Sequence, residues 1–120
     1  MANPVLLYTA SVSTLFHLIG LLYANGNVPA WIVAYMMTGC ATSIWNHGTT
    51  SELAKWSDRV AMWVGTAATY WNTVGQPTHY MIPPMIIAYF AAKYLGRTEP
   101  HIAAHAIITV INLKLLSGYR

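Results

Sequence analysis

Residues 4–23 read PVLLYTASVSTLFHLIGLLY, a run of twenty residues without a charged side chain. About 20 mostly apolar residues are what an α-helix needs to cross the hydrocarbon core of a bilayer, which is roughly 30 Å thick. The run ends at Asn25-Gly26-Asn27, residues that are typical of a turn. This stretch predicts a first transmembrane helix from Pro4 to Tyr23.

Four more apolar segments follow, each separated from the next by a short polar or glycine-containing break. They run from Pro29 to about Asn46, from Ser57 to near Gly75, from Thr78 to Leu95 and from Thr98 to about Ser117. Ser57 is a suitable N-cap for the third segment, which places Asp58 in the first turn. The adjacent Pro83 and Pro84 predict a kink or a break in the fourth segment.

The sequence therefore predicts an all-α fold: an integral membrane bundle of five transmembrane helices with up-down topology and short loops. Residues 1–120 form a single transmembrane domain. The composition supports this prediction, because 56% of the residues are hydrophobic and only 8% are charged. A soluble domain carries about 25% charged residues.

The few charges favour one orientation and exclude one class of partner. Four basic residues lie on the N-terminal side of the predicted bundle and two lie towards the opposite side: Lys55, Arg59, Lys93 and Arg97, against Lys114 and Arg120. The positive-inside rule then predicts a multi-pass protein with a cytoplasmic N-terminus and its C-terminus on the opposite side. The basic residues form no cluster, so the sequence does not support nucleic-acid binding.

Five polar residues in the apolar segments are the candidate functional residues. Ser43-Ile-Trp-Asn-His47 and His101-Ile-Ala-Ala-His105 each pair two polar side chains four residues apart, on one face of a helix. Ionisable or metal-binding side chains inside a bilayer are costly and commonly functional. The end of the second helix, the start of the third, with Asp58, and the start of the fifth lie on one side of an up-down bundle. We therefore expect all five residues to meet at one depth, near the cytoplasmic surface.

Three imidazoles with one open coordination position are typical of a catalytic zinc site. His47, His101 and His105 are the predicted metal ligands, and the cofactor is Zn2+, which activates a bound water for hydrolysis. Asp58 is placed to hold that water and take its proton. Ser43 could orient the water or stabilise a developing oxyanion. Asp58 and Ser43 are thus the predicted catalytic residues.

The order and spacing of these motifs resemble the CREST superfamily of membrane hydrolases, which includes the alkaline ceramidases and the progestin and adipoQ receptors. The interval from His47 to Asp58 is most similar to that of the alkaline ceramidases. The resemblance implies a zinc-dependent hydrolase that cleaves an amide bond in a ceramide-like N-acyl membrane lipid. The family has seven helices, whereas this sequence predicts five. A homo-oligomer or a larger membrane complex could cover the surface that the two absent helices leave exposed.

Other interpretations of the same residues remain open. His17 and His79 are predicted to be hydrogen-bonding partners between helices rather than ligands. Asp58 could interact only with the dipole of its helix. The whole chain could be a small non-catalytic transmembrane subunit of a larger membrane complex, or a receptor-like protein with a structural zinc.

Overall fold

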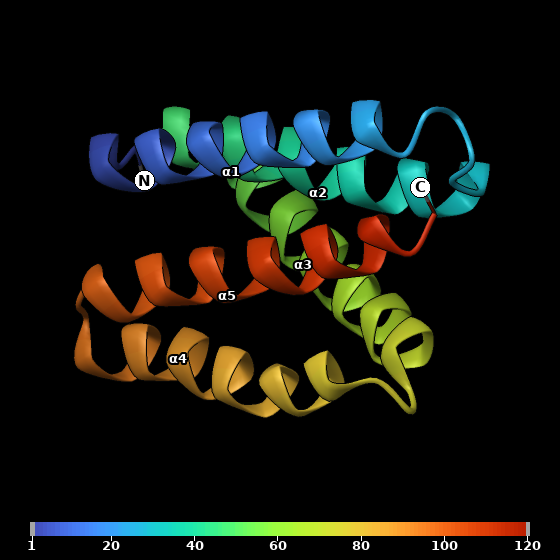
Figure 1. Ribbon diagram of the computed structural model, residues 1–120. Helices are drawn as coiled ribbons and strands as arrows, with labels where there is room; N and C mark the ends of the chain where they lie inside the picture. Colours follow the sequence, from blue (N-terminus) through green and yellow to red (C-terminus); the bar gives the residue numbers. More distant parts are fainter. Residues whose placement is uncertain (1, 120) are drawn as a thin grey trace.

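The computed structural model describes residues 2–119, and within this range the chain forms helices joined by turns (Figure 1). The elements are α1 (Pro4–Tyr23), α2 (Ala30–Gly48), α3 (Glu52–Thr73), the 3-10 helix η1 (Pro77–Met81), α4 (Ile82–Leu95) and α5 (Glu99–Ser117). The prediction of an all-α fold with five long helices is confirmed for the described residues.

The first and last helices begin and end close to the predicted residues. Asn3 caps α1, because its side-chain oxygen accepts a hydrogen bond from the backbone N–H of Leu6 at 3.1 Å. After α1, Asn25 and Gly26 adopt left-handed conformations with φ of 53° and 76°, and the chain reverses there. The turn signal in the sequence was therefore correct.

The third helix begins six residues earlier than the sequence predicted. Its N-cap is Ser51 and not Ser57, since the Ser51 hydroxyl accepts from the backbone N–H of Ala54 at 3.2 Å. Glu52 then occupies the first turn, where a negative charge interacts favourably with the helix dipole. Asp58 lies beyond that first turn, so an interaction with the helix N-terminus does not account for it.

The predicted fourth helix is interrupted just before its two prolines. Residues Pro77–Met81 form η1, and α4 begins at Ile82, so Pro83 and Pro84 lie in the first turn of α4. Backbone N–H groups in the first turn have no intrahelical acceptor, which makes proline acceptable there. The interruption is therefore a change of helix type and not a kink within α4.

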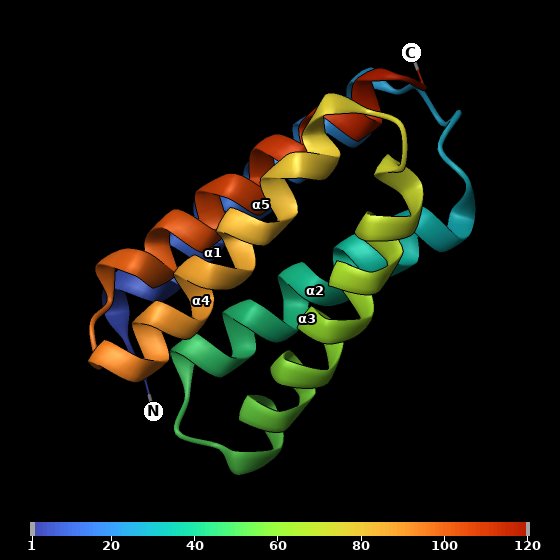
Figure 2. The same ribbon diagram turned by 90° about the horizontal axis from the view of Figure 1, so that it is seen from below.

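The helices alternate in direction, and α5 lies beside α1 and α4 (Figure 2). It packs against α1 and α4, and α2 packs against α1 and α3. Two clusters of buried residues form the core on either side of α5: Ile32, Met36, Leu115 and Leu116 in one, and Ile82, Met85, Ala104 and Ile111 in the other. The end of α2 and the starts of α3 and α5 consequently lie at one end of the bundle. These helix ends carry the candidate residues.

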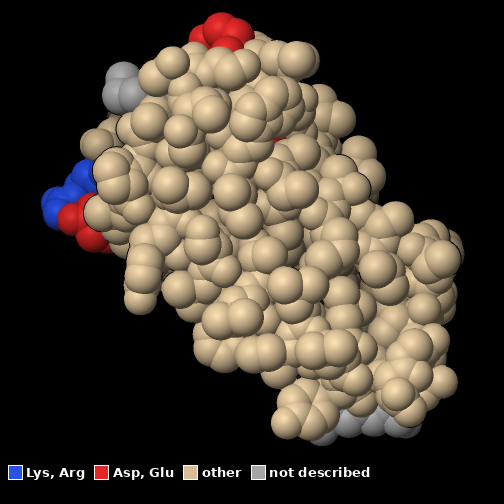
Figure 3. Space-filling model, turned by 90° about the horizontal axis from the view of Figure 1, so that it is seen from above, with Lys and Arg blue, Asp and Glu red and all other residues tan. Residues whose placement is uncertain are grey.

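Two of the described helices, α1 and α5, are long and apolar enough to cross a membrane. The other helices are less suited by length or composition. Helix α3 carries several charged side chains in its first turns, and α4 has only 14 residues. One face of the molecule is nearly free of charged groups, which gather at one end in that view (Figure 3).

Candidate metal centre

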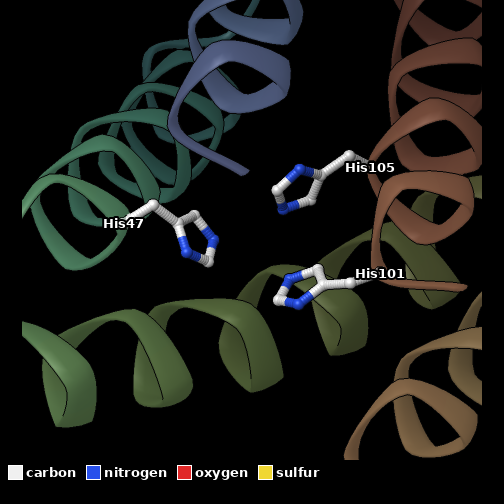
Figure 4. Close-up of side chains that lie close together, drawn as sticks. All are labelled: His47, His101 and His105. Atoms are coloured by element: carbon white, nitrogen blue, oxygen red, sulfur yellow. The ribbon is translucent and has the colours of Figure 1, made fainter. Parts of the chain in front are cut away.

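Three histidines from two helices converge at the end of the bundle where the chain begins. His47 lies in the last turn of α2, and His101 and His105 lie in the first turns of α5. Each offers one ring nitrogen, and these three atoms lie within 4.8 Å of one another. Their rings point toward a common space (Figure 4), with ring centroids 4.7 to 5.4 Å apart. The predicted grouping of these histidines is thus found, and they could form a metal site.

His47 has a donor or acceptor atom that the protein leaves unused. The residue is 4% exposed, and its Nε2 atom is buried without a hydrogen-bond partner among the described residues. Leaving a buried polar atom without a partner costs about 1–3 kcal/mol. Coordination of a metal by this nitrogen would remove that cost, so the orphaned atom fits a metal ligand.

A hydrogen bond from α1 fixes the ring of His105. The Thr9 hydroxyl lies 3.0 Å from His105 Nδ1 and donates its own hydrogen to the Leu6 carbonyl at 3.1 Å. With its hydrogen on the Leu6 carbonyl, the hydroxyl oxygen accepts from His105 Nδ1–H, the tautomer that fits both contacts. The lone pair of His105 is then on Nε2 and free to bind a metal. Metal-binding histidines commonly donate their other nitrogen in this way, and such partners orient the ring.

The predicted catalytic residues share a cavity with two of the histidines. Ser43 and Asp58 line the same cavity as His101 and His105. Asp58 is held by Asn46, whose amide donates to the carboxylate Oδ2 at 2.8 Å. The second carboxylate oxygen is left for another donor.

Two cavities of opposite character meet at this group of residues. The first, of about 150 Å³, extends into the bundle and is lined mainly by apolar side chains from all five α-helices. The second, of about 190 Å³, is lined by His47 and by the cationic side chains of Arg59 and Lys93. Asp58 and His101 line both cavities. The site therefore lies at the boundary between an apolar interior and a polar opening.

The two remaining histidines have partners elsewhere, as the sequence predicted for His17. It is 3% exposed and bridges α1 and α5 through a 2.9 Å hydrogen bond with Asn112. His79 lies in η1, where its Nδ1 is 3.1 Å from the Thr73 hydroxyl. Neither residue is part of the three-histidine group.

Three positioning residues were not identified from the sequence: Thr9, Asn46 and Asn3. The Asn3 backbone N–H donates to the His47 carbonyl at 2.8 Å, and its side chain donates to Thr98 at 3.5 Å. Asn3 thus ties the end of α2 to the start of α5. Asn46 directly precedes a predicted ligand, and Thr9 lies four residues before Ser13 and eight before His17. These spacings on one helix face were the available signals.

Comparisons with protein families, with curated proteins and with solved structures found no match to this chain.

We expect His47→Ala, His101→Ala and His105→Ala each to remove most of the bound metal, because ligands from two helices act as a unit. Wild type should carry about one metal ion per chain, as a three-imidazole site does. Elemental analysis of detergent-purified protein measures this. The control is His79→Ala, which should keep the wild-type metal content. Metal loss in the His79 variant alone would contradict the assignment.

Thr9→Val should weaken metal binding by about 10- to 100-fold, because it removes the hydrogen bond that orients His105. Competition with a chelator of known affinity measures the change. Thr14→Val is the matched control, since the Thr14 hydroxyl donates to a backbone carbonyl of its own helix at 2.8 Å. Equal affinities of the two variants would show that Thr9 does not position the ligand.

Proposed function

We propose that this chain is a five-helix integral membrane zinc hydrolase that cleaves an amide bond in a ceramide-like N-acyl lipid, in the manner of the CREST superfamily. The observation that carries the proposal is the three-histidine group placed between an apolar cavity and a polar opening. The mechanism needs a metal, a proton acceptor and space for an acyl chain, and the residues that would provide them lie together.

The surface of the bundle supports a membrane location. Large apolar side chains are exposed on all five α-helices, including Leu22, Trp31, Trp71, Ile87 and Val110. Only 17% of the apolar span of α1 is buried inside the molecule, which is unlike the core helix of a soluble protein. The longest dimension of the molecule is 38 Å, compared with roughly 30 Å for a hydrocarbon core. We propose that all five helices cross the bilayer with the N-terminus in the cytoplasm.

The donor set favours zinc. Three imidazoles without a thiolate suit zinc, copper, iron or nickel, and three protein ligands with an open position are typical of catalytic zinc. A zinc ion held there supplies Lewis-acid activation of a water molecule.

The chain's own residues would move the proton and hold the reacting group. Asp58 keeps one carboxylate oxygen on Asn46, so its other oxygen can accept the proton of the attacking water and pass it to the leaving amine. Ser43, which lines the cavity beside Asp58, would donate a hydrogen bond to the amide oxygen as negative charge develops there. The Asn46 amide keeps the carboxylate turned toward the site.

The two cavities suggest how a lipid would bind. Its acyl chain would enter the apolar cavity, because burying methylene groups there is favourable by about 0.8 kcal/mol each. Its polar part would face the opening that Arg59 and Lys93 line. The amide bond would then lie at the junction of the two, beside the histidines.

The membrane location predicts that the protein stays in the pellet after alkaline carbonate washing of membranes and is released only by detergent. The reason is that the exposed apolar side chains would lose contact with lipid in water. Ultracentrifugation followed by immunoblotting measures the distribution. Release by carbonate alone would contradict five membrane spans.

Asp58→Asn should keep the metal but lower the rate of N-acyl lipid hydrolysis by about 100-fold or more, since a positioned acid–base group contributes that much. Ser43→Ala should have a smaller effect, because it removes one hydrogen bond and no charge. Fatty-acid release from ceramides in mixed micelles measures the rate, and elemental analysis of each variant controls for metal. The absence of any turnover by zinc-loaded wild type would refute the enzyme and favour a structural metal.

A further inference from the structure

The inner end of the apolar cavity contains polar atoms that no part of the metal site uses. Tyr35 on α2, Thr69 on α3 and Asn112 on α5 all line this cavity. The Tyr35 hydroxyl oxygen, the Thr69 hydroxyl oxygen and the Asn112 side-chain oxygen are buried, and none has a hydrogen-bond partner among the described residues. Thr69 is 1% and Asn112 is 5% exposed. The Tyr35 and Thr69 hydroxyls lie close enough to interact with each other, whereas the Asn112 oxygen has no partner among the described residues. The Asn112 oxygen, with two hydroxyls in the lining of the same cavity, indicates a site for a ligand group.

The chemistry of Asn112 is fixed by its neighbour. His17 Nδ1 lies 2.7 Å from the Ser13 carbonyl, which can only accept, so His17 must carry its proton on Nδ1. Nε2 of a neutral His17 then accepts from the Asn112 amide nitrogen at 2.9 Å. The free atom of Asn112 is consequently its carbonyl oxygen, and this oxygen needs a donor.

The hydroxyl groups of Tyr35 and Thr69 can each donate and accept a hydrogen bond. The Tyr35 hydroxyl lies close enough to Thr69 and Asn72 on α3 to interact with both side chains. A hydroxyl can donate one hydrogen bond and accept others. The inner end has no charged side chain in its lining, because Asp58 is the only charged residue along the cavity. The matching ligand group is neutral, and it both donates and accepts.

We propose that this inner polar subsite, formed by Tyr35, Thr69 and Asn112, binds a hydroxyl group carried on the chain of the lipid ligand. The hydroxyl would donate to the Asn112 carbonyl oxygen and accept from Tyr35 or Thr69. The proposal rests on the proposed function in one respect, namely that the polar end of the lipid lies at the histidines. It names the substrate class more narrowly, as an acyl chain with a hydroxyl near its far end.

Helix geometry gives the distance between the two sites. Asn112 is seven residues beyond His105, Thr69 is eleven beyond Asp58, and the helices run so that both steps lead away from the metal centre. At about 1.5 Å per residue these separations are roughly 10 and 16 Å. An extended chain of about ten to twelve carbons spans such a distance. A hydroxyl close to the headgroup would not reach the subsite.

The experiment compares three fatty acids bound to zinc-loaded protein in one detergent: dodecanoate, 2-hydroxydodecanoate and 12-hydroxydodecanoate. Dissociation constants come from the shift of the unfolding temperature with ligand concentration. We expect 12-hydroxydodecanoate to bind about five- to tenfold more tightly than the other two, as one or two added neutral hydrogen bonds allow. Tyr35→Phe with Thr69→Val should abolish this preference and leave dodecanoate affinity near the wild-type value.

Thr42→Val is the matched control, because the Thr42 hydroxyl donates to a backbone carbonyl of its own helix and does not line the cavity. It should keep the preference. Equal binding of the three acids by wild type, a preference that survives in the double variant, or no binding of any acid would overturn the subsite. If the double variant does not fold, Tyr35→Phe and Thr69→Val are tested singly against the same prediction. Failure of lipid hydrolysis leaves this comparison unchanged, so the two proposals fail separately.

Discussion

The interface between α1 and α5 depends on a ladder of three hydrogen-bonded contacts between side chains. Thr9 pairs with His105, Ser13 with Thr109 and His17 with Asn112, at nearly equal steps along two parallel helices. In an apolar environment each such bond contributes only about 0.6 kcal/mol on average, so the ladder is not primarily a source of stability. The ladder instead fixes the position of α5 along α1. Sliding α5 along α1 by one residue would break all three contacts between the helices, and their loss would oppose such a shift of His105.

The other two ligands are positioned from the same helix end. Asn3 caps α1 and also joins the backbone of His47 to the side chain of Thr98, which precedes α5. The N-terminus of α1 therefore locates both helices that carry the histidines. Because the buried Nε2 of His47 has no partner where the three rings approach one another, the arrangement is costly unless something binds there.

The sequence predicted the helices and the histidine group well because both depend on the spacing of residues that are close in sequence. His101 and His105 share a face at any helix register, and His47 can reach them only if the bundle runs up and down. The start of α3 was wrong because Ser51 and Ser57 are equally good caps by residue type, and Glu52 beside Ser51 decides between them. Thr9 was missed because its contact spans 96 residues of sequence. No pattern of neighbouring residues predicts that the Thr9 hydroxyl contacts the His105 ring.

The position of Asp58 links the two cavities to the proposed chemistry. Hydrolysis of a lipid needs water and an acyl chain at the same bond, although the two favour opposite environments. Asp58 and His101 are in the lining of both the apolar cavity and the polar opening. Arg59 and Lys93 line the opening alone, so positive charge is placed on the side from which water would come. A carboxylate at the boundary can exchange protons with the opening while it faces the chain, which a residue deeper in the apolar cavity could not do.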